Sequence, residues 1–126
     1  MTDSRRVETL ADTRRMVVKV GTNVLAGKPF GKRRIAALAS QVAELSARGI
    51  SVVMVSSGAI GAGMQQLGLA RRPERLPGLQ AAAAVGQTQL MKMWDASLGR
   101  RGLTSAQVLL TRDDCSHRRR YLNARN

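Results

Sequence analysis

Two short runs of mostly β-branched residues, each followed at once by small residues, constrain the fold of this chain more than any other feature. The first run covers residues 16–20 and ends at Gly21, and the second covers residues 50–55 and ends at Ser56-Ser57-Gly58. Both runs are nearly continuous in apolar character, which is typical of strands buried on both faces of a parallel sheet. We therefore expect two such strands, each opening at its carboxyl end onto a turn of small residues.

The segment between the two runs has the period of a helix. Within residues 31–48, one helical face carries Ile35, Leu38, Ala39, Val42 and Leu45, and Gly49 follows as a stop. A strand, a helix and a second strand in this order predict a crossover between parallel neighbours.

The rest of the chain continues the alternation of helix and strand. We expect a short helix ending at Gly68, a loop over residues 71–78, a helix over 79–98, a third strand over 106–110, and the opening turns of a helix over 116–126 with Tyr121 and Leu122 facing inward. The predicted fold class is α/β, an open and mainly parallel sheet with flanking helices, built from about three β/α units.

The domain boundaries follow from composition and from the size of this sheet. Residues 1–13 are polar and aperiodic, which predicts a flexible leader and leaves residues 14–126 as the domain. An open sheet of three strands would leave one face poorly covered. We therefore expect residues 14–126 to be the amino-terminal portion of a larger domain.

The charge of the chain favours an anionic partner. The sequence has 21 Lys and Arg residues against 8 Asp and Glu residues, a formal net charge of +13. Such an excess suits a nucleotide, a nucleic acid or the acidic remainder of the same fold, although an arginine-biased solvated surface is the simpler explanation. With only three aromatic residues and no recognised binding motif, we do not expect specific nucleic-acid binding.

Cysteine usage and hydropathy give the expected location. Cys115 is the only cysteine and one histidine is present, so the sequence predicts neither an internal disulfide nor a zinc site of the usual kind. The amino terminus has no apolar signal region, and the Ala-rich stretch near residue 83 is too short to span a bilayer. We expect a cytoplasmic protein that does not associate with membranes.

Lys19 is the first candidate functional residue. It lies inside an apolar run, where an ammonium group is costly unless it meets an anion or water. It also lies near the carboxyl end of its strand, where ligands bind in open α/β sheets, and Gly21 allows close approach of the backbone. A phosphate would suit this position, but a lysine that reaches solvent from the strand end explains the same pattern.

The turn after the second strand is the second candidate. Ser57, Gly58 and Ala59 leave room for a ligand, and the N–H groups at the start of the following helix favour a phosphate or carboxylate. Taken alone, the motif is also what an ordinary tight turn between strand and helix requires.

Taken together, five ordered blocks resemble the amino-acid kinase family, and within it the glutamate 5-kinases. The blocks are VVKVGTNVL at 17–25, VSSGAI at 55–60, QAAAAVGQ at 80–87, LLTRD at 109–113 and YLNAR at 121–125. The resemblance implies transfer of the γ-phosphate of ATP, with Mg²⁺, to the side-chain carboxylate of L-glutamate, which gives glutamyl 5-phosphate, the first intermediate of proline biosynthesis.

The resemblance also implies roles for particular residues. Lys19 would be the catalytic residue and would contact the ATP phosphates, while Gly21 and Thr22 would line the phosphate path. L-glutamate would be held by Ser57 together with the backbone of Gly58 and Ala59. No residue of this chain is expected to bind a metal directly.

The resemblance covers one wall of the family's active site. The remaining glutamate contacts, an organising aspartate, a second lysine and the adenine pocket would lie beyond residue 126. We therefore expect this chain alone to be inactive. We expect the complete enzyme to be a homo-oligomer. The missing part could also be supplied by a separate carboxyl-terminal half. The alternatives are another member of the superfamily (an acetylglutamate, aspartate or carbamate kinase), a basic nucleic-acid-binding protein and a degenerate fragment.

Overall fold

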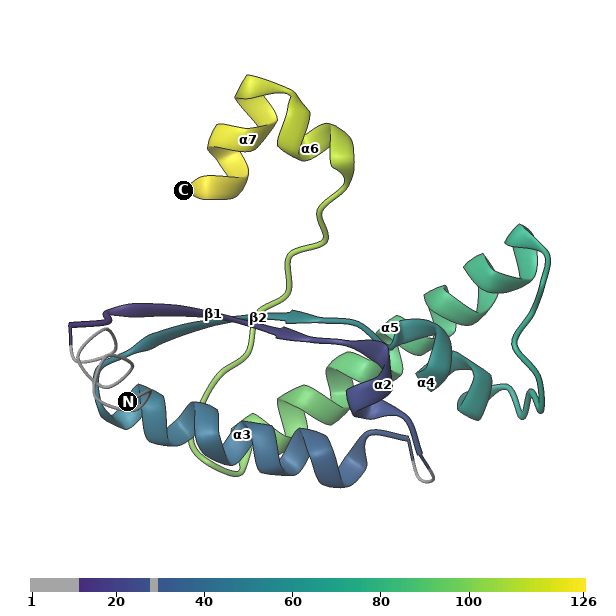
Figure 1. The fold of residues 1–126 in the computed structure, drawn as a ribbon, viewed down its shortest axis with the longest axis horizontal. Helices are drawn as coiled ribbons and strands as arrows, with labels where there is room; N and C mark the ends of the chain where they lie inside the picture. Colours follow the sequence, from purple (N-terminus) through teal and green to yellow (C-terminus); the bar gives the residue numbers. More distant parts are fainter. Residues whose placement is uncertain (1–11, 28–29) are drawn as a thin grey trace, which may run out of the picture.

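The computed structural model describes residues 12–27 and 30–126, which form a two-stranded sheet, a layer of helices and a small helical pair set apart from them (Figure 1). The predicted leader, residues 1–13, lies almost wholly outside the described residues. In chain order the elements are β1 (Arg15–Val20), α2 (Thr22–Leu25), α3 (Lys32–Ala47), β2 (Ser51–Ser56), α4 (Ala59–Gln66), α5 (Leu76–Gly99), α6 (Arg112–Ser116) and α7 (Arg118–Arg125).

The two predicted strands form and pair in parallel. The register runs from Arg15 opposite Ser51 to Val20 opposite Ser56. The helix predicted between them is α3, and Gly49 after it has the positive φ of 78° that a glycine adopts without strain. The predicted strand–helix–strand unit is therefore confirmed.

One face of the sheet is covered by helices. Figure 1 shows α3 and the second part of α5 below β1 and β2, while the first part of α5 extends past the end of the sheet toward α4. The core between these layers contains Val20, Leu25, Phe30, Ile35, Ala62, Leu90 and Trp94, and the half-buried Val18 and Met54 pack against it. The apolar stripes of the two helices thus meet the inward-facing residues of each strand.

The other face of the sheet is bare, which contradicts the prediction of strands buried on both faces. Val17 is 66% exposed, and Val53 and Val55 are 49% and 51% exposed. Because strand side chains alternate between faces, these valines and Lys19 all project from the side opposite to α3 and α5. The β-branched runs would suit a sheet covered on both sides, but within the described residues only one side is covered.

Helices α4 and α5 cross at very close range. A Cβ atom added at Gly63 would collide with the backbone carbonyl of Ala82, and one added at Gly86 would collide with the carbonyl of Ala59. The two glycines therefore let the helix backbones touch. This contact fixes the start of α4, which is also the end of the Ser57–Gly58 turn.

The third predicted strand does not form. Residues 104–110 form no strand, the sheet of the described chain contains only β1 and β2, and Val108, Leu109 and Leu110 are exposed. An extended segment becomes a strand only when a neighbour takes up its N–H and C=O groups. Figure 1 shows this segment running from the helical layer past the sheet to α6 and α7.

The carboxyl-terminal helix forms but is not packed as expected. Tyr121 in α7 is 48% exposed and Leu122 is half-buried, so the inward orientation predicted for Tyr121 is wrong. Helix α5 begins at Leu76 rather than near residue 79, with Pro77 in its first turn, where the missing N–H of proline is harmless. The sequence analysis did not predict the short helices α2 and α6.

Candidate functional site

The parallel register brings the two candidate motifs to the same end of the sheet. Lys19 lies opposite Val55, Val20 lies opposite Ser56, and the backbone N–H of Ser57 donates to the carbonyl of Val20 at 2.8 Å. Opposite ends of the sheet would have contradicted a shared site. Instead, the ammonium-bearing strand end and the small-residue turn are next to each other.

Lys19 lies on the uncovered face of the sheet. Its side chain is exposed, whereas the next residue, Val20, is 2% exposed and points into the core. No ion pair of Lys19 occurs among residues 12–27 and 30–126. The ammonium group is therefore available to an anion that approaches the carboxyl end of β1 from the open side.

The turn after β2 leads directly into helix α4. Gly58 occupies the N-cap position without any side-chain hydrogen bond to the first turn, and the first backbone bond of the helix runs from the N–H of Ala62 to the carbonyl of Gly58. The N–H groups of a first helical turn have no partner within the helix and carry the positive end of its dipole. The N–H groups at this helix start can donate hydrogen bonds to a carboxylate or phosphate oxygen.

Gly58 is required by conformation and by packing. Its φ of 111° is in the left-handed region, and an added Cβ atom would lie 2.9 Å from Cζ of Phe30 and 3.2 Å from Cδ1 of Leu25. Gly61, one turn further, would bring a Cβ atom to 2.6 Å from Cε2 of Phe30. The Phe30 ring thus packs directly beneath the turn.

A hydrogen-bonded pair supports the turn from within the core. The indole N–H of Trp94 donates to Oγ of Ser56 at 3.2 Å, and the Ser56 hydroxyl donates to the carbonyl of Ser57 at 3.1 Å. Because Trp94 is 4% exposed and belongs to α5, this contact ties the turn to the longest helix. Ser57 itself is half-buried.

The loop after β1 is open. Gly21 precedes α2 with an ordinary φ of −75°, and an added Cβ atom would meet nothing within 4 Å. Thr22 and Asn23 in α2 are exposed. Among the described residues, the space beside Gly21 is therefore open, as a phosphate path would require.

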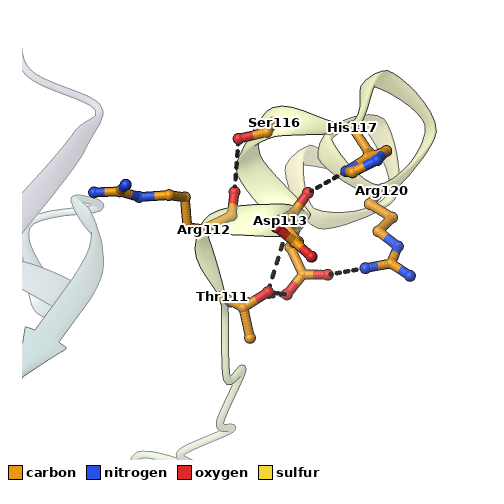
Figure 2. Close-up of polar contacts among 7 residues, drawn as sticks. Thr111, Arg112, Asp113, Ser116, His117 and Arg120 are labelled. Carbon is orange, nitrogen blue, oxygen red and sulfur yellow. Dashed lines mark hydrogen bonds and ion pairs between the residues drawn. The ribbon is translucent and has the colours of Figure 1, made fainter.

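Helix α6 carries the most extensive polar network of the described residues, which Figure 2 shows. The backbone N–H and the hydroxyl of Thr111 donate to Oδ2 of Asp114 at 2.8 and 2.6 Å, and the backbone N–H of Asp114 donates to Oγ1 of Thr111 at 3.3 Å. These contacts form a capping box. Nη1 of Arg120 approaches Oδ1 of Asp114 at 3.9 Å.

The hydrogen bonds from Thr111, its side chain first and then its backbone, lower the pKa of Asp114 below its usual range. The LLTRD block therefore has a structural explanation of its own. Thr111 of this block and Asp114, the residue directly after the block, form the cap that starts helix α6.

The described residues do not form a metal site. Within residues 12–27 and 30–126, no three His, Cys, Asp or Glu side chains converge on a point that could hold an ion. None of the helices in this described part has an apolar stretch long enough to cross a membrane.

The residues that support the site were not expected from the sequence. Phe30 lies in a loop without periodicity, and no sequence pattern identifies it. Trp94 was recognised only as part of an apolar stripe, and Ser56 only as a small residue. A tryptophan on a core-facing stripe needs a partner for its N–H group, which could have directed attention to Ser56.

Comparison with known proteins assigns the chain to a family. Residues 14–126 match the amino acid kinase family. The chain is 55% identical over 112 residues to "Glutamate 5-kinase" of Meiothermus ruber, covering 89% of this chain and 29% of the relative. It is 52% identical over 122 residues to "Glutamate 5-kinase" of Citrifermentans bemidjiense, covering 95% and 33%.

A further relative, "Glutamate 5-kinase" of Marinomonas sp., is 49% identical over 121 residues, covering 94% of this chain and 32% of the relative. The chain thus spans about a third of the length of the curated relatives that it matches. The matched region contains both strand ends described above. This chain belongs to the amino acid kinase family.

Proposed function

We propose that this chain forms part of the active site of a glutamate 5-kinase, which transfers the γ-phosphate of ATP to the side-chain carboxylate of L-glutamate and gives glutamyl 5-phosphate. The observation that carries the proposal is the meeting of Lys19 and the Ser57–Gly58 turn at one end of the sheet. The names of the relatives favour glutamate over the substrates of acetylglutamate, aspartate or carbamate kinases.

In this proposal, the end of β1 binds ATP and the turn after β2 binds glutamate. The ammonium group of Lys19 contacts the phosphates of ATP and stabilises the charge that develops on the transferred group. Gly21 and Thr22 leave the path along which the phosphates lie. Ser57 and the backbone N–H groups of Gly58 and Ala59 bind glutamate and orient its side-chain carboxylate for in-line attack.

The partners of the proposed enzyme are ATP and L-glutamate. Mg²⁺ would arrive with the nucleotide, and no step of the proposal depends on a metal ligand from this chain. A cytoplasmic location and assembly into a homo-oligomer belong to the same proposal. Assayed alone, the 126-residue chain is expected to show no glutamate-dependent ATP turnover, because the relatives named as kinases are about three times as long.

A chimaera tests the proposal directly. Residues 14–126 replace the matching segment of the Meiothermus ruber glutamate 5-kinase, to which the chain is 55% identical. In the active chimaera, Lys19→Ala is expected to lower kcat by about 100-fold or more, because it removes a charge that acts on the transferred group. Ser57→Ala is expected to raise the KM for glutamate by about tenfold, with a smaller effect on kcat.

Steady-state kinetics with varied ATP and glutamate distinguish these effects. Arg48→Ala, which removes an exposed cation just beyond α3, is the matched control and should leave both constants unchanged. Equal and mild effects of Lys19→Ala and Ser57→Ala would contradict the assigned roles. An inactive chimaera that is folded would contradict the proposed function itself.

A further inference from the structure

A second hollow lies between the helices, apart from the candidate site. It has a volume of about 670 Å³ and is formed by the start of α3, the end of α4 and the second half of α5. Pockets of this size hold small organic ligands in many proteins. Lys19, Thr22 and Ser57 do not line it, so it is separate from the two strand ends.

The walls of this helical pocket are held by a specific contact. Nη1 of Arg101 donates to the carbonyl of Ser97 at 2.9 Å, and Nη2 donates to the carbonyl of Ala36 at 3.2 Å. Both Ala36 and Ser97 line the pocket, so one half-buried guanidinium fixes the spacing of α3 and α5 around it. The pocket is therefore a fixed feature of the helical layer.

The lining combines an apolar base with a positively charged rim. Its apolar base consists of the buried Phe30, Ile35 and Ala62 and the half-buried Met93, which has the most accessible surface of the four. The charged side chains of the lining are all cations: Lys32, Arg33, Lys92 and Arg100. They are exposed, and none of them makes an ion pair within residues 12–27 and 30–126. The described residues that line the pocket include no acidic side chain, so this surface complements an anion that carries an apolar body.

Phe30 connects this pocket with the candidate site. It lines the pocket, and its ring packs under Gly58 and Gly61. Its backbone N–H donates to Oε1 of Gln65, another lining residue, at 2.8 Å. A ligand in the pocket would therefore touch the residue that supports the Ser57–Gly58 turn.

We propose that the helical pocket binds a small organic anion with an aromatic or other flat apolar body, and that Phe30 transmits its binding to the Ser57–Gly58 turn. The cationic rim takes the charged group, and Met93 and the small accessible part of Phe30 pack against the body. Binding itself does not depend on the kinase function proposed above.

Methionine methyl NMR on the 126-residue chain tests the binding. Phenyl phosphate is titrated into protein labelled at the methionine methyl groups, with phenol and inorganic phosphate as matched probes. The Met93 signal is expected to shift and saturate, while that of Met91, which lines a different cavity, stays in place. Each matched probe is expected to bind at least about tenfold more weakly, because phenol lacks the charged group and inorganic phosphate lacks the apolar body.

Charge variants separate this pocket from the general basicity of the chain. Lys92→Gln combined with Arg100→Gln is expected to weaken phenyl phosphate binding by about tenfold, since two rim cations are lost. Arg34→Gln combined with Arg48→Gln removes the same charge outside the pocket and should change binding less than about twofold.

Any of the following results would overturn the binding proposal. One is an equal loss in both double variants, and another is saturation by inorganic phosphate at the same concentration, which would indicate an adventitious ion only. The third is an unmoved Met93 signal or methionine signals without dispersion, because Met93 would then not be packed in a pocket.

Backbone amide signals test the link to the turn. On titration with phenyl phosphate, the signals of Ser57 and Gly58 are expected to shift together with Met93. In Phe30→Leu, the Met93 shift should persist while the Ser57 and Gly58 shifts are lost. Turn signals that do not respond in the unaltered chain, or that respond equally in Phe30→Leu, would refute the transmission by Phe30.

Discussion

At the scale of single residues, the two candidate turns contain glycines of different kinds. Gly58 has a positive φ and the Phe30 ring beneath it, so the fold itself requires a glycine there. Gly21 has an ordinary φ and open space where a side chain would project. The chain's own packing therefore gives no reason for Gly21, and a ligand that needs the space would give one.

This difference predicts opposite outcomes for alanine substitutions. Gly58→Ala is expected to lower the free energy of unfolding by about 1–3 kcal/mol through backbone strain and the clash with Phe30. Gly21→Ala should change it by less than about 0.5 kcal/mol, yet impair ATP-dependent turnover in the chimaera. Urea denaturation and kinetics measure the two effects. A Gly21→Ala protein with full activity would remove the case for a phosphate path beside this residue.

The contact between Trp94 and Ser56 predicts an energetic coupling. Trp94→Phe and Ser56→Ala each break the hydrogen bond between the indole N–H and the serine hydroxyl. In a double-mutant cycle, the two changes together are expected to cost about 1 kcal/mol less than the sum of the single changes. Denaturation of the three variants measures this term, with Trp94→Phe and Ser40→Ala as the control cycle. Simple additivity for Trp94 and Ser56 would mean that the contact does not stabilise the turn.

At the scale of elements, continuous β-branched runs made β1 and β2 predictable, and helical periodicity made α3 and most of α5 predictable. The 104–110 segment has the composition of a strand but lacks a neighbour to pair with, and composition cannot reveal whether a neighbour is present. Helix α6 was missed although Thr111 and Asp114 have the spacing of a capping box. Five residues give too little periodicity for detection, so the cap was the available signal.

The candidate site, too, was only partly predictable from the sequence. The positions of Lys19 and Ser57 followed from the rule that parallel strands end at one edge of a sheet. The support by Phe30 and Trp94 depends on contacts between residues 35 or more positions apart in sequence, such as Trp94 with Ser56 and Phe30 with Gln65. No local pattern records such contacts.

The capping box of α6 predicts a pH-dependent helix. The hydrogen bonds from Thr111 hold the pKa of Asp114 below its unfolded value, so the stabilisation of α6 is present above that unfolded value and is lost as the pH falls through the lowered folded pKa. Backbone carbon shifts of residues 112–116, followed from pH 7 to pH 2, are expected to lose helical character at the acidic end of this range.

Asp114→Asn provides the matched variant for this titration. It retains a side-chain acceptor but no titrating carboxyl group, so the acid transition of α6 should disappear. A transition of unchanged size in Asp114→Asn would assign it to another group. Helix α3 has Gly31 as its N-cap with no side-chain cap bond, and it serves as the internal control.

At the scale of the whole molecule, the sheet has one covered and one bare face. Val17, Val53 and Val55 form an exposed apolar surface on the bare face, while Val18 and Met54 pack toward the helices from the covered face. Such a surface on a domain with a two-stranded sheet favours association with other apolar surfaces. The covered face, in contrast, supplies the hydrophobic stabilisation of the fold.

This asymmetry predicts that similar substitutions on the two faces have different consequences. Val17→Thr, Val53→Thr and Val55→Thr together are expected to reduce self-association of the 126-residue chain in sedimentation velocity and to change its Tm little, because the new hydroxyl groups remain in water. Val18→Thr with Met54→Thr puts hydroxyl groups against the core and should destabilise the chain by about 2 kcal/mol or more.

If the three exposed changes lowered the Tm as much as the two inward ones, the outer face would have to be buried in the chain itself. That result would contradict the two-layer arrangement on which the positions of Lys19 and the Ser57–Gly58 turn depend.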